Sequence, residues 1–436
     1  MASLSGKSHV SAAMSEGFQK SAVGVVPADW EVKPLGNVFT LKHGFAFSSE
    51  HFSASGPIVL TPGNFRLDGG LYFEPRNTKR YAGNYSLATR FRKGDLLIVM
   101  TDLTPGCHLL GKPAFIESDE AILHNQRIGK VELKAKSIDL RFLYFTLLSG
   151  QYLHRIREKA TGSTVRHTSS KSIYSIQIAW PTFPEQCAIA AALSDVDALL
   201  AELDALIAKK RDLKQAAMQQ LLTGQTRLPG FSRKWEVKRL GDVATFHKGK
   251  GLPKSALFAS GVDPCIHYGE LFTRYRETIG AIISRTNGLG DSFRSLSNDV
   301  LMPTSDVTPR GLAKASCVPF DNVILGGDIL VIRADKQRLD GSFLSYVIRR
   351  EEHQVLQLVS GSTVFHLYGS DMKKFSFSMP PITEQAAIGT VLSDMDAELT
   401  ALEGRRDKTR ALKQGMMQEL LTGRIRLIDG TELSPH

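Results

Sequence analysis

Residues 185–223 read EQCAIAAALSDVDALLAELDALIAKKRDLKQAAMQQLLT, and residues 384–422 read EQAAIGTVLSDMDAELTALEGRRDKTRALKQGMMQELLT. The second segment repeats the first at a shift of 199 residues without a gap, from the opening Glu-Gln pair to the closing Leu-Leu-Thr. An ungapped repeat of this length indicates that the chain contains two equivalent structural units.

Each copy is predicted to form one long helix. In the first copy no Pro or Gly interrupts the segment, and apolar residues recur every three or four positions from Ile189 to Ile207, which is the spacing of one helix face. Pro184 stands where a first turn tolerates proline, and Gly224 stands where a helix ends. The apolar seam is typical of a coiled coil. The simplest arrangement packs the two helices antiparallel, with their seams against each other.

Outside the helices, the two copies keep short motifs in the same order. Trp-Glu-Val-Lys occurs at 30–33 and 235–238, and Asp-Leu-Thr-Pro at 102–105 corresponds to Asp-Val-Thr-Pro at 306–309. Gly-Ser-Thr-Val occurs at 162–165 and 361–364. Between these motifs the copies diverge, which favours one shared fold that serves two different ligands.

The globular blocks are predicted to be rich in β-strands with one helix each. Apolar runs that follow glycine predict strands at 95–100 and 328–333, and the segments 142–148 and 343–348 suit helices. We therefore expect an α+β fold with two β-rich mixed α/β domains joined by two long antiparallel coiled-coil helices. The expected boundaries are a flexible leader at 1–14, a domain at 15–180, a helix at 181–226, a domain at 227–378, a helix at 379–424 and a tail at 425–436.

The positive charge is confined to the two globular blocks. The chain has 436 residues and a formal net charge of +10. Residues 29–180 carry a net charge of +7 and residues 233–378 carry +5, whereas the helical segments 185–224 and 381–424 carry −2 and −1. This distribution indicates that the blocks bind a polyanion such as nucleic acid.

Composition excludes several other classes of protein. The four cysteines are scattered without a Cys-x-x-Cys pair, which argues against a zinc site and against a disulfide framework. No apolar run approaches the roughly 20 residues of a membrane span, and the first residues lack the apolar core of a signal peptide. We expect a cytoplasmic protein with reduced thiols.

Two motifs resemble catalytic motifs but do not meet the requirements of a catalytic site. Residues 106–112 resemble part of a phosphate-binding loop, but Pro113 stands where Ser or Thr must hold magnesium. Asp119 with residues 132–134 imitates the D…E-x-K pattern of nucleases, but the second copy does not reproduce it. The sequence also has no S-adenosylmethionine loop and no His-Glu-x-x-His set. We therefore expect no enzyme, no catalytic residue, no metal ligand and no cofactor-binding residue in this chain.

The motifs closely resemble the specificity subunit of type I restriction-modification systems. The resemblance rests on Trp-Glu-Val-Lys-x-Leu-Gly at the start of each block, Gly-Ser-Thr-Val near its end, and Glu-Gln-x-x-Ile leading into a helix that closes with Leu-Leu-Thr-Gly. It covers nearly the whole chain from about residue 16, and it is specific because order, spacing and duplication agree.

The resemblance implies a pseudo-two-fold arrangement of two target-recognition domains, each of which reads half of a bipartite site on double-stranded DNA. It also implies that two methyltransferase subunits, which modify adenine at N6, dock on equivalent surfaces, and that ATP-dependent restriction subunits join them. S-adenosylmethionine, ATP and magnesium would be bound by those partners and not by this chain. The helices would set the spacer between half-sites, and the stretch 221–224 is a natural place for an insertion that widens it.

Candidate DNA-binding residues are basic or amide side chains in the two blocks, because Lys and Arg bind phosphates and Arg or Asn read base edges. They are Lys42, Asn64, Arg66, Arg76, Lys79, Arg80, Arg90, Arg92, Arg166, Lys248, Lys250, Lys254, Arg274, Arg276, Arg285, Arg294 and Arg310. Candidate residues for partner docking and the coiled coil are Glu185, Gln186, Ile189, Leu193, Leu200, Leu203, Glu384, Gln385, Ile388, Leu392, Leu399 and Leu402.

An alternative hypothesis is a coiled-coil adaptor that binds only other proteins and recognises no DNA. In that case the positive charge has no reason to concentrate in the blocks. The charge distribution therefore favours the DNA-binding interpretation.

Overall fold

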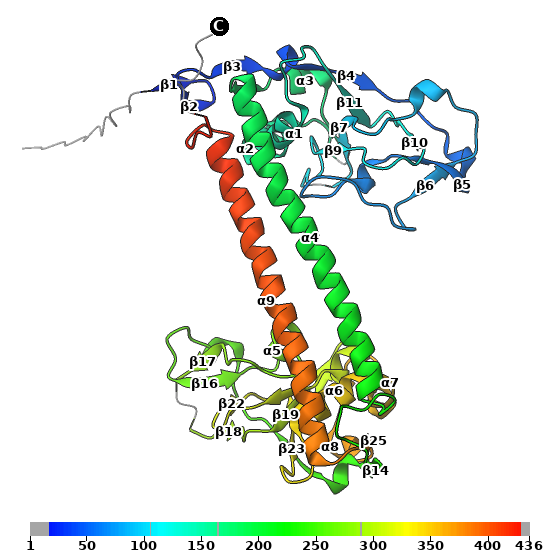
Figure 1. Ribbon diagram of the computed structural model, residues 1–436, viewed down its shortest axis with the longest axis vertical. Helices are drawn as coiled ribbons and strands as arrows, with labels where there is room; N and C mark the ends of the chain where they lie inside the picture. Colours follow the sequence, from blue (N-terminus) through cyan, green and yellow to red (C-terminus); the bar gives the residue numbers. More distant parts are fainter. Residues whose placement is uncertain (1–16, 105, 164, 288–289, 429–436) are drawn as a thin grey trace, which may run out of the picture. The chain divides into compact units, whose positions relative to one another are not determined.

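The computed structural model describes residues 17–104, 106–163, 165–287 and 290–428 (Figure 1). The leader expected at 1–14 and the last residues of the expected tail lie outside these ranges. The chain forms two compact units: unit 1 comprises residues up to Ala201 together with those from Lys408 onward, and unit 2 comprises Glu202–Asp407. Along the described ranges, the structure contains no helix with the length and apolar character of a membrane span.

Unit 1 is built on a four-stranded antiparallel sheet in the order β4-β11-β7-β9. A three-stranded sheet in the order β10-β5-β6 lies in the same unit, with β10 and β5 parallel. The strands of these two sheets are β4 (Phe39–His43), β11 (Ile128–Leu133), β7 (Leu96–Val99), β9 (Pro113–Phe115), β10 (Ile122–Leu123), β5 (Phe52–Val59) and β6 (Lys79–Tyr81). The predicted strand at 95–100 corresponds to β7, whose four residues are all buried.

Short elements complete unit 1. Two-stranded pairs join β1 (Phe18–Ser21) to β2 (Gly24–Pro27), β3 (Glu31–Pro34) to β13 (Gln177–Trp180), and β8 (Thr101–Asp102) to β12 (Arg166–His167). The helices of the block are α1 (Leu140–Leu148), α2 (Gly150–Glu158) and α3 (Ser170–Tyr174). The Asp139 side chain accepts a hydrogen bond from the Phe142 amide and thereby caps the start of α1.

Unit 2 contains a four-stranded sheet with the same order of equivalent strands, β15-β23-β19-β21. Its second sheet differs and has the order β17-β16-β22-β18. These strands are β15 (Ala244–Lys248), β23 (Ile329–Ala334), β19 (Asp299–Pro303), β21 (Ser316–Val318), β17 (Ser284–Thr286), β16 (Asp263–Ile266), β22 (Ile324–Leu325) and β18 (Phe293–Arg294). The two units therefore share the first sheet and differ in the strand order of the second.

The remaining elements of unit 2, except α5, also have counterparts in unit 1. They are the pairs β14 (Glu236–Arg239) with β25 (Ser376–Met379) and β20 (Ser305–Asp306) with β24 (Phe365–His366), and the helices α5 (Glu270–Thr273), α6 (Gly341–Arg350), α7 (Glu352–Leu358) and α8 (Gly369–Met372). Asp340 caps α6 through the Phe343 amide, as Asp139 caps α1 in unit 1.

Two helices of 39 residues each, α4 (Phe183–Leu221) and α9 (Ile382–Leu420), contribute to both units (Figure 1). In unit 2, Asp204 pairs with Arg406 and Lys214 pairs with Asp396, at 3.7 and 2.7 Å. Residue numbers rise along α4 while those of their partners fall along α9, so the two segments run antiparallel. In unit 1, Lys413 pairs with Asp197 at 2.6 Å, and this pair is the repeat equivalent of Lys214 with Asp396.

The beginning of each helix packs into a globular core. Ile189 and Leu193 belong to the buried cluster of unit 1 that contains Phe142. Ile388 and Leu392 occupy the matching cluster of unit 2. The expected packing of seam against seam is therefore incomplete for the first turns, because the domain core covers the same apolar stripe.

Candidate nucleic-acid interface

The Glu-Gln pair at the start of α4 is held inside unit 1. The buried carboxylate of Glu185 accepts hydrogen bonds from Trp30 Nε1 at 2.9 Å and from the Arg426 guanidinium at 2.6 and 2.8 Å. Arg426 also donates to both carboxylate oxygens of Asp29, and these hydrogen bonds lower the pKa of Asp29. Its hydrogen bonds to Glu185 and Asp29 raise the pKa of Arg426.

Unit 2 repeats this arrangement. Glu384 is also fully buried, and it accepts hydrogen bonds from Arg227 at 2.5 and 2.6 Å and from Trp235 Nε1 at 3.2 Å. The interaction with Glu384 raises the pKa of Arg227. We refer to Trp30, Glu185 and Arg426 as the unit 1 anchor, and to Trp235, Glu384 and Arg227 as the unit 2 anchor.

The next residue of each pair, a glutamine, ties the long helix to its block. The side chain of Gln186 accepts a hydrogen bond from the Asp139 amide and donates to the Pro181 carbonyl. Gln385 makes the same contacts with Asp340 and Pro380.

The buried candidates for partner docking are therefore corrected. Their side chains are buried, so they present no surface to another protein, while the coiled-coil role stays a prediction for Leu203 and Leu399. These residues are Glu185, Gln186, Ile189, Leu193, Leu203, Glu384, Gln385, Ile388, Leu392 and Leu399. Leu200 and Leu402 are half-buried on α4 and α9.

A basic groove of about 670 Å³ opens in unit 2 where β15, β20, β23 and β24 converge. Its charged lining comprises Lys248 and Lys373, with Asp328 at 3.7 Å from Lys248. His366 and the exposed ring of Tyr368 stack with their centroids 6.1 Å apart and also line the groove. Two lysines and exposed hydrogen-bonding rings are suited to phosphates and base edges. We call this the unit 2 groove.

The Gly-Ser-Thr-Val motif forms a turn beside this groove. Ser360 and His366 exchange backbone hydrogen bonds of 3.0 and 2.7 Å. Gly361 has a φ of +112°, and a Cβ there would lie 2.2 Å from the Val364 carbonyl oxygen. Only glycine fits this position without strain, which explains why both copies keep it: Gly162 has a φ of +95° in the corresponding turn of unit 1.

The corresponding region of unit 1 has different side chains. Lys42 and His43 end β4, and the His43 ring contacts Ser170 at 2.9 Å. Arg166 Nε and Thr168 Oγ are buried without a hydrogen-bond partner among the described residues. The equivalent positions in unit 2 are Phe365 and Leu367. Unit 1 therefore has an arginine at the half-buried position where unit 2 has a phenylalanine, whereas Thr168 and Leu367 are both buried.

A buried histidine adjoins the Lys42 end of β4. Burial lowers the pKa of His124, and the nearby charges of Lys130, His43 and Lys42 lower it further, against a hydrogen bond with the Ile128 carbonyl that raises it. His124 is therefore neutral at physiological pH. The positive charge at this end of β4 comes from its lysine and not from His124.

The predicted DNA-binding residues fall into three groups. The first group makes no ion pair within the described ranges: Lys42, Arg66, Lys79, Arg90, Arg92, Arg166, Lys254 and Arg285. The second group pairs with a carboxylate of its own unit: Arg76, Arg80, Lys248, Lys250, Arg274, Arg294 and Arg310. Exposed ion pairs are weak, and the Arg76 and Arg310 side chains are 80% and 82% exposed. Both groups therefore stay predictions.

The third group consists of two candidates that the structure contradicts. Asn64 is fully buried; its side chain accepts hydrogen bonds from Thr61 and donates to the Asn77 carbonyl. Arg276 binds Asp396 at 3.1 Å and Glu403 at 2.6 Å, both on α9. The first stabilises a turn, and the second attaches its loop to the long helix.

Reasoning from the sequence missed several groove residues, including Lys373, His366 and Tyr368. The Gly-Ser-Thr-Val motif was a signal for His366 and Tyr368, because they come directly after it, as His167 and Ser169 do in unit 1. Sequence reasoning also missed Arg227 and Arg426, although they occupy the same position after the two Thr-Gly pairs.

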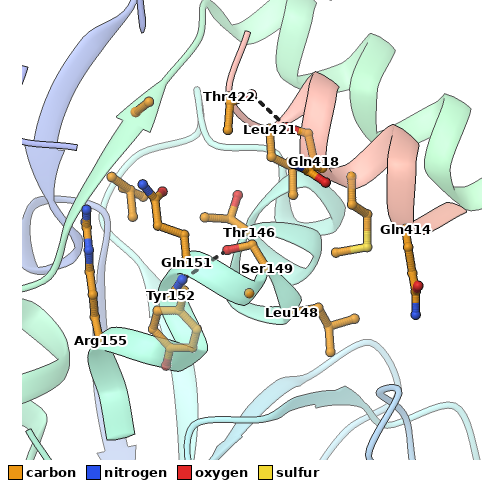
Figure 2. Close-up of a pocket in the computed structure, with 14 residues that line it drawn as sticks. Thr146, Leu148, Ser149, Gln151, Tyr152, Arg155, Gln414, Gln418, Leu421 and Thr422 are labelled. Carbon is orange, nitrogen blue, oxygen red and sulfur yellow. Dashed lines mark hydrogen bonds between the residues drawn. The ribbon is translucent and has the colours of Figure 1, made fainter. Parts of the chain in front are cut away.

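Another hollow, of about 500 Å³, lies in unit 1 between the α1–α2 turn and the last turns of α9 (Figure 2). Ser149 and Tyr152 lie on one side, and Gln414 and Gln418 on the other. The charged residue in its lining is Arg155, which donates to the Gln177 carbonyl. Burial raises the pKa of Tyr152 and keeps its hydroxyl neutral. A hollow of this character is unsuited to a polyanion.

Comparison with known proteins gives a family match over most of the chain. The type I restriction modification DNA specificity domain matches it twice, at residues 27–210 and 232–409. Two relatives from Methanocaldococcus jannaschii are each 22% identical to it. One is the type I restriction enzyme MjaVIII specificity subunit, with 92% of this chain and 94% of the relative covered. The other is the putative type I restriction enzyme MjaX specificity subunit, with 94% of this chain and 97% of the relative covered.

A solved structure supports the fold. The S subunit of a type I restriction-modification system from M. genitalium superposes with a TM-score of 0.59 at 17% identity. The superposition covers 90% of this chain and 96% of that chain.

Proposed function

This chain belongs to the type I restriction-modification specificity family, and we propose from this that each of its two target-recognition domains reads one half of a bipartite DNA site. The recognition surface in unit 2 is the basic groove. In unit 1 it is the corresponding region around Lys42, His43 and Arg166. The chain itself is non-catalytic and directs partner enzymes to the site.

The observation that carries this proposal is that the two units share one fold but differ in the side chains beside the turn. The four-stranded sheet, the Gly-Ser-Thr-Val turn and the anchor recur in both units. Beside the turn, however, unit 1 has Arg166 where unit 2 has Phe365, and the second sheets of the two units differ in strand order. Different donor and apolar patterns discriminate different base pairs, so two unlike half-sites are expected.

The same proposal implies the partners. Two adenine-N6 methyltransferase subunits dock on the repeated surfaces, and ATP-dependent restriction subunits join the complex. S-adenosylmethionine, ATP and magnesium bind to those subunits. The antiparallel segments of α4 and α9 act as a coiled-coil spacer between the two domains.

The alternative adaptor function lacks support in the charge distribution. An adaptor that binds only proteins has no need for positive charge confined to the two globular blocks, or for two lysines in the unit 2 groove. We therefore retain DNA recognition as the function.

The test is the pattern of N6-methyladenine in the host genome with and without this chain. We expect one bipartite motif, two short sequences around a fixed spacer, to lose methylation when the chain is deleted and to regain it on complementation. The full chain should also bind mixed-sequence duplex with an affinity that falls as salt rises. Unchanged methylation after deletion, together with binding that salt does not weaken, would remove the proposal.

A further inference from the structure

An exposed aliphatic residue occurs at the same place in both units. Leu103 comes directly after β8 in unit 1 and is 59% exposed; Val307 comes directly after β20 in unit 2 and is 73% exposed. They are equivalent residues of the repeated Asp-x-Thr-Pro motif. Between the shared motifs the blocks diverge, and an exposed apolar residue kept at the same place in both is suited to contact something that both half-sites have in common.

Both residues are held in place by the acidic residue before them. In unit 1 the buried Asp102 carboxylate accepts hydrogen bonds from the Thr104 amide at 2.8 Å and the Leu109 amide at 2.6 Å. In unit 2 Asp306 accepts one from the Thr308 hydroxyl at 3.1 Å. The two amide contacts fix the backbone of the loop in unit 1, and the hydroxyl contact joins the side chains on either side of Val307 in unit 2.

A valine stands at the end of the partner strand in both units. Asp306 pairs with Phe365 at the end of the ladder; Val307 follows Asp306, and Val364, which is 44% exposed and lines the unit 2 groove, precedes Phe365. In unit 1, Leu103 follows Asp102 and Val165 precedes Arg166, which are likewise the last pair of their ladder. We call Val307 with Val364, and Leu103 with Val165, the apolar tips.

Basic residues border the tips. Lys248, Lys373 and His366 line the unit 2 groove together with Val364, and Arg166 is adjacent to Val165 in unit 1. A basic groove with an apolar edge complements duplex DNA, whose phosphates are anionic and whose sugars and base faces are apolar. DNA-binding proteins use aliphatic side chains in this way as wedges between base steps.

We propose that Leu103 and Val307 are apolar wedges that press into the DNA at equivalent positions of the two half-sites, while the neighbouring basic residues hold the phosphates. This inference rests on the proposed DNA-reading function. The wedge contacts sugar and base faces that every sequence offers, so it adds affinity and local unstacking in both half-sites. The discriminating contacts come from the residues that differ, such as Arg166 and Phe365.

The test compares the full chain with the double variant Leu103→Ala, Val307→Ala on a short duplex that carries the methylated motif. Removal of both wedges is expected to weaken binding about tenfold, the loss expected when a few methylene and methyl groups no longer leave water. The salt dependence should stay unchanged because no charge is removed. Permanganate reactivity of unstacked thymines in the complex should also fall.

Two controls are matched in exposure and chemistry. Leu412→Ala, at 59% exposure in unit 1, and Val237→Ala, at 74% exposure in unit 2, should bind like the wild type. Lys248→Glu should instead reduce the slope of affinity against salt, because it removes a candidate phosphate contact.

The outcomes separate the wedge from the function on which it rests. If the wild type binds the motif and the double variant binds and unstacks it equally well, the wedge is wrong and DNA recognition stands. If only methylation in cells is lost while DNA binding is intact, the tips contact a protein partner and the wedge is again wrong. If the wild type itself shows no salt-dependent binding to the motif, the proposed function fails together with the wedge.

Discussion

Replacement of Arg426 by alanine is expected to lower the free energy of unfolding of unit 1 by about 3 kcal/mol, because it leaves the buried Glu185 carboxylate without its counter-charge. Glu185 has no exposed side-chain surface, and Trp30 Nε1 then remains as its hydrogen-bond donor. Urea unfolding monitored by hydrogen exchange, read separately for peptides of each unit, measures the effect and shows where it acts.

Arg424, two residues before Arg426, provides a control substitution. Arg424 pairs with Glu419 at the surface, where the two side chains are 49% and 36% exposed, so Arg424→Ala should change stability by less than about 1 kcal/mol. Arg227→Ala should destabilise unit 2 instead of unit 1, because it removes the partner of Glu384. If Arg426→Ala proves as mild as Arg424→Ala, the anchor does not hold unit 1 together.

Four residues added to both long helices should widen the spacer of the methylated motif by one or two base pairs. Four helical residues add about 6 Å and rotate the rest of the helix by about 40°. One base pair advances about 3.4 Å and turns by roughly 35°. The insertions belong after Ala201 in α4 and before Lys408 in α9, where the flanking side chains are exposed and the two units divide. The spacer is read from the methylated motif of cells that carry the variant.

Insertion into α4 alone is the matched control. It lengthens α4 but not α9, so the Asp197–Lys413 pair of unit 1 and the Lys214–Asp396 pair of unit 2 can no longer form together, and methylation should fall. The stretch 221–224 is a poorer site than the sequence suggested. Leu221 and Leu222 are buried in the core of unit 2, and Gly224 packs near Trp235 with a φ of +70°. If the variant with both helices extended is active and its spacer is unchanged, the helices do not set the length of the spacer.

Local signals in the sequence were enough to predict the elements that form this fold. The uninterrupted apolar periodicity between Pro184 and Gly224 corresponds to α4, and the apolar run at 328–333 corresponds to β23. These predictions succeed because helix and strand periods are properties of neighbouring residues.

The partners of those elements could not be predicted in the same way. The apolar stripe from Ile189 could pack against another helix or against a domain core, and periodicity does not distinguish the two. Glu185 looked like an exposed docking residue because its counter-charge, Arg426, lies 241 residues away in the sequence. Arg276 was misplaced for the same reason, since its partners Asp396 and Glu403 are 120 and 127 residues away. Asn64 differs, because its partner Thr61 is only three residues away and the pair is a local capping motif.

The repeat itself carried more functional information than the basic residues did. Many candidate arginines and lysines have carboxylate partners in their own unit, as Lys250 has with Asp291. Motifs kept by both copies, by contrast, form the anchors, the Gly-Ser-Thr-Val turns and the apolar tips. His366 and Arg426 occupy equivalent positions of the two copies with His167 and Arg227, so a position-by-position comparison of the copies is enough to single them out.

The central claim is that each unit reads its half-site independently. It is tested most directly with a chain that carries the target-recognition domain of unit 2 in both places. Residues 30–180 are replaced by residues 235–379, which share the same frame at both junctions, and methylated adenines are mapped in cells that carry this variant. The account predicts a symmetric motif in which the half-site of unit 2 is followed, after the spacer, by its own reverse complement. A folded, active variant that still methylates the original asymmetric motif would contradict independent reading.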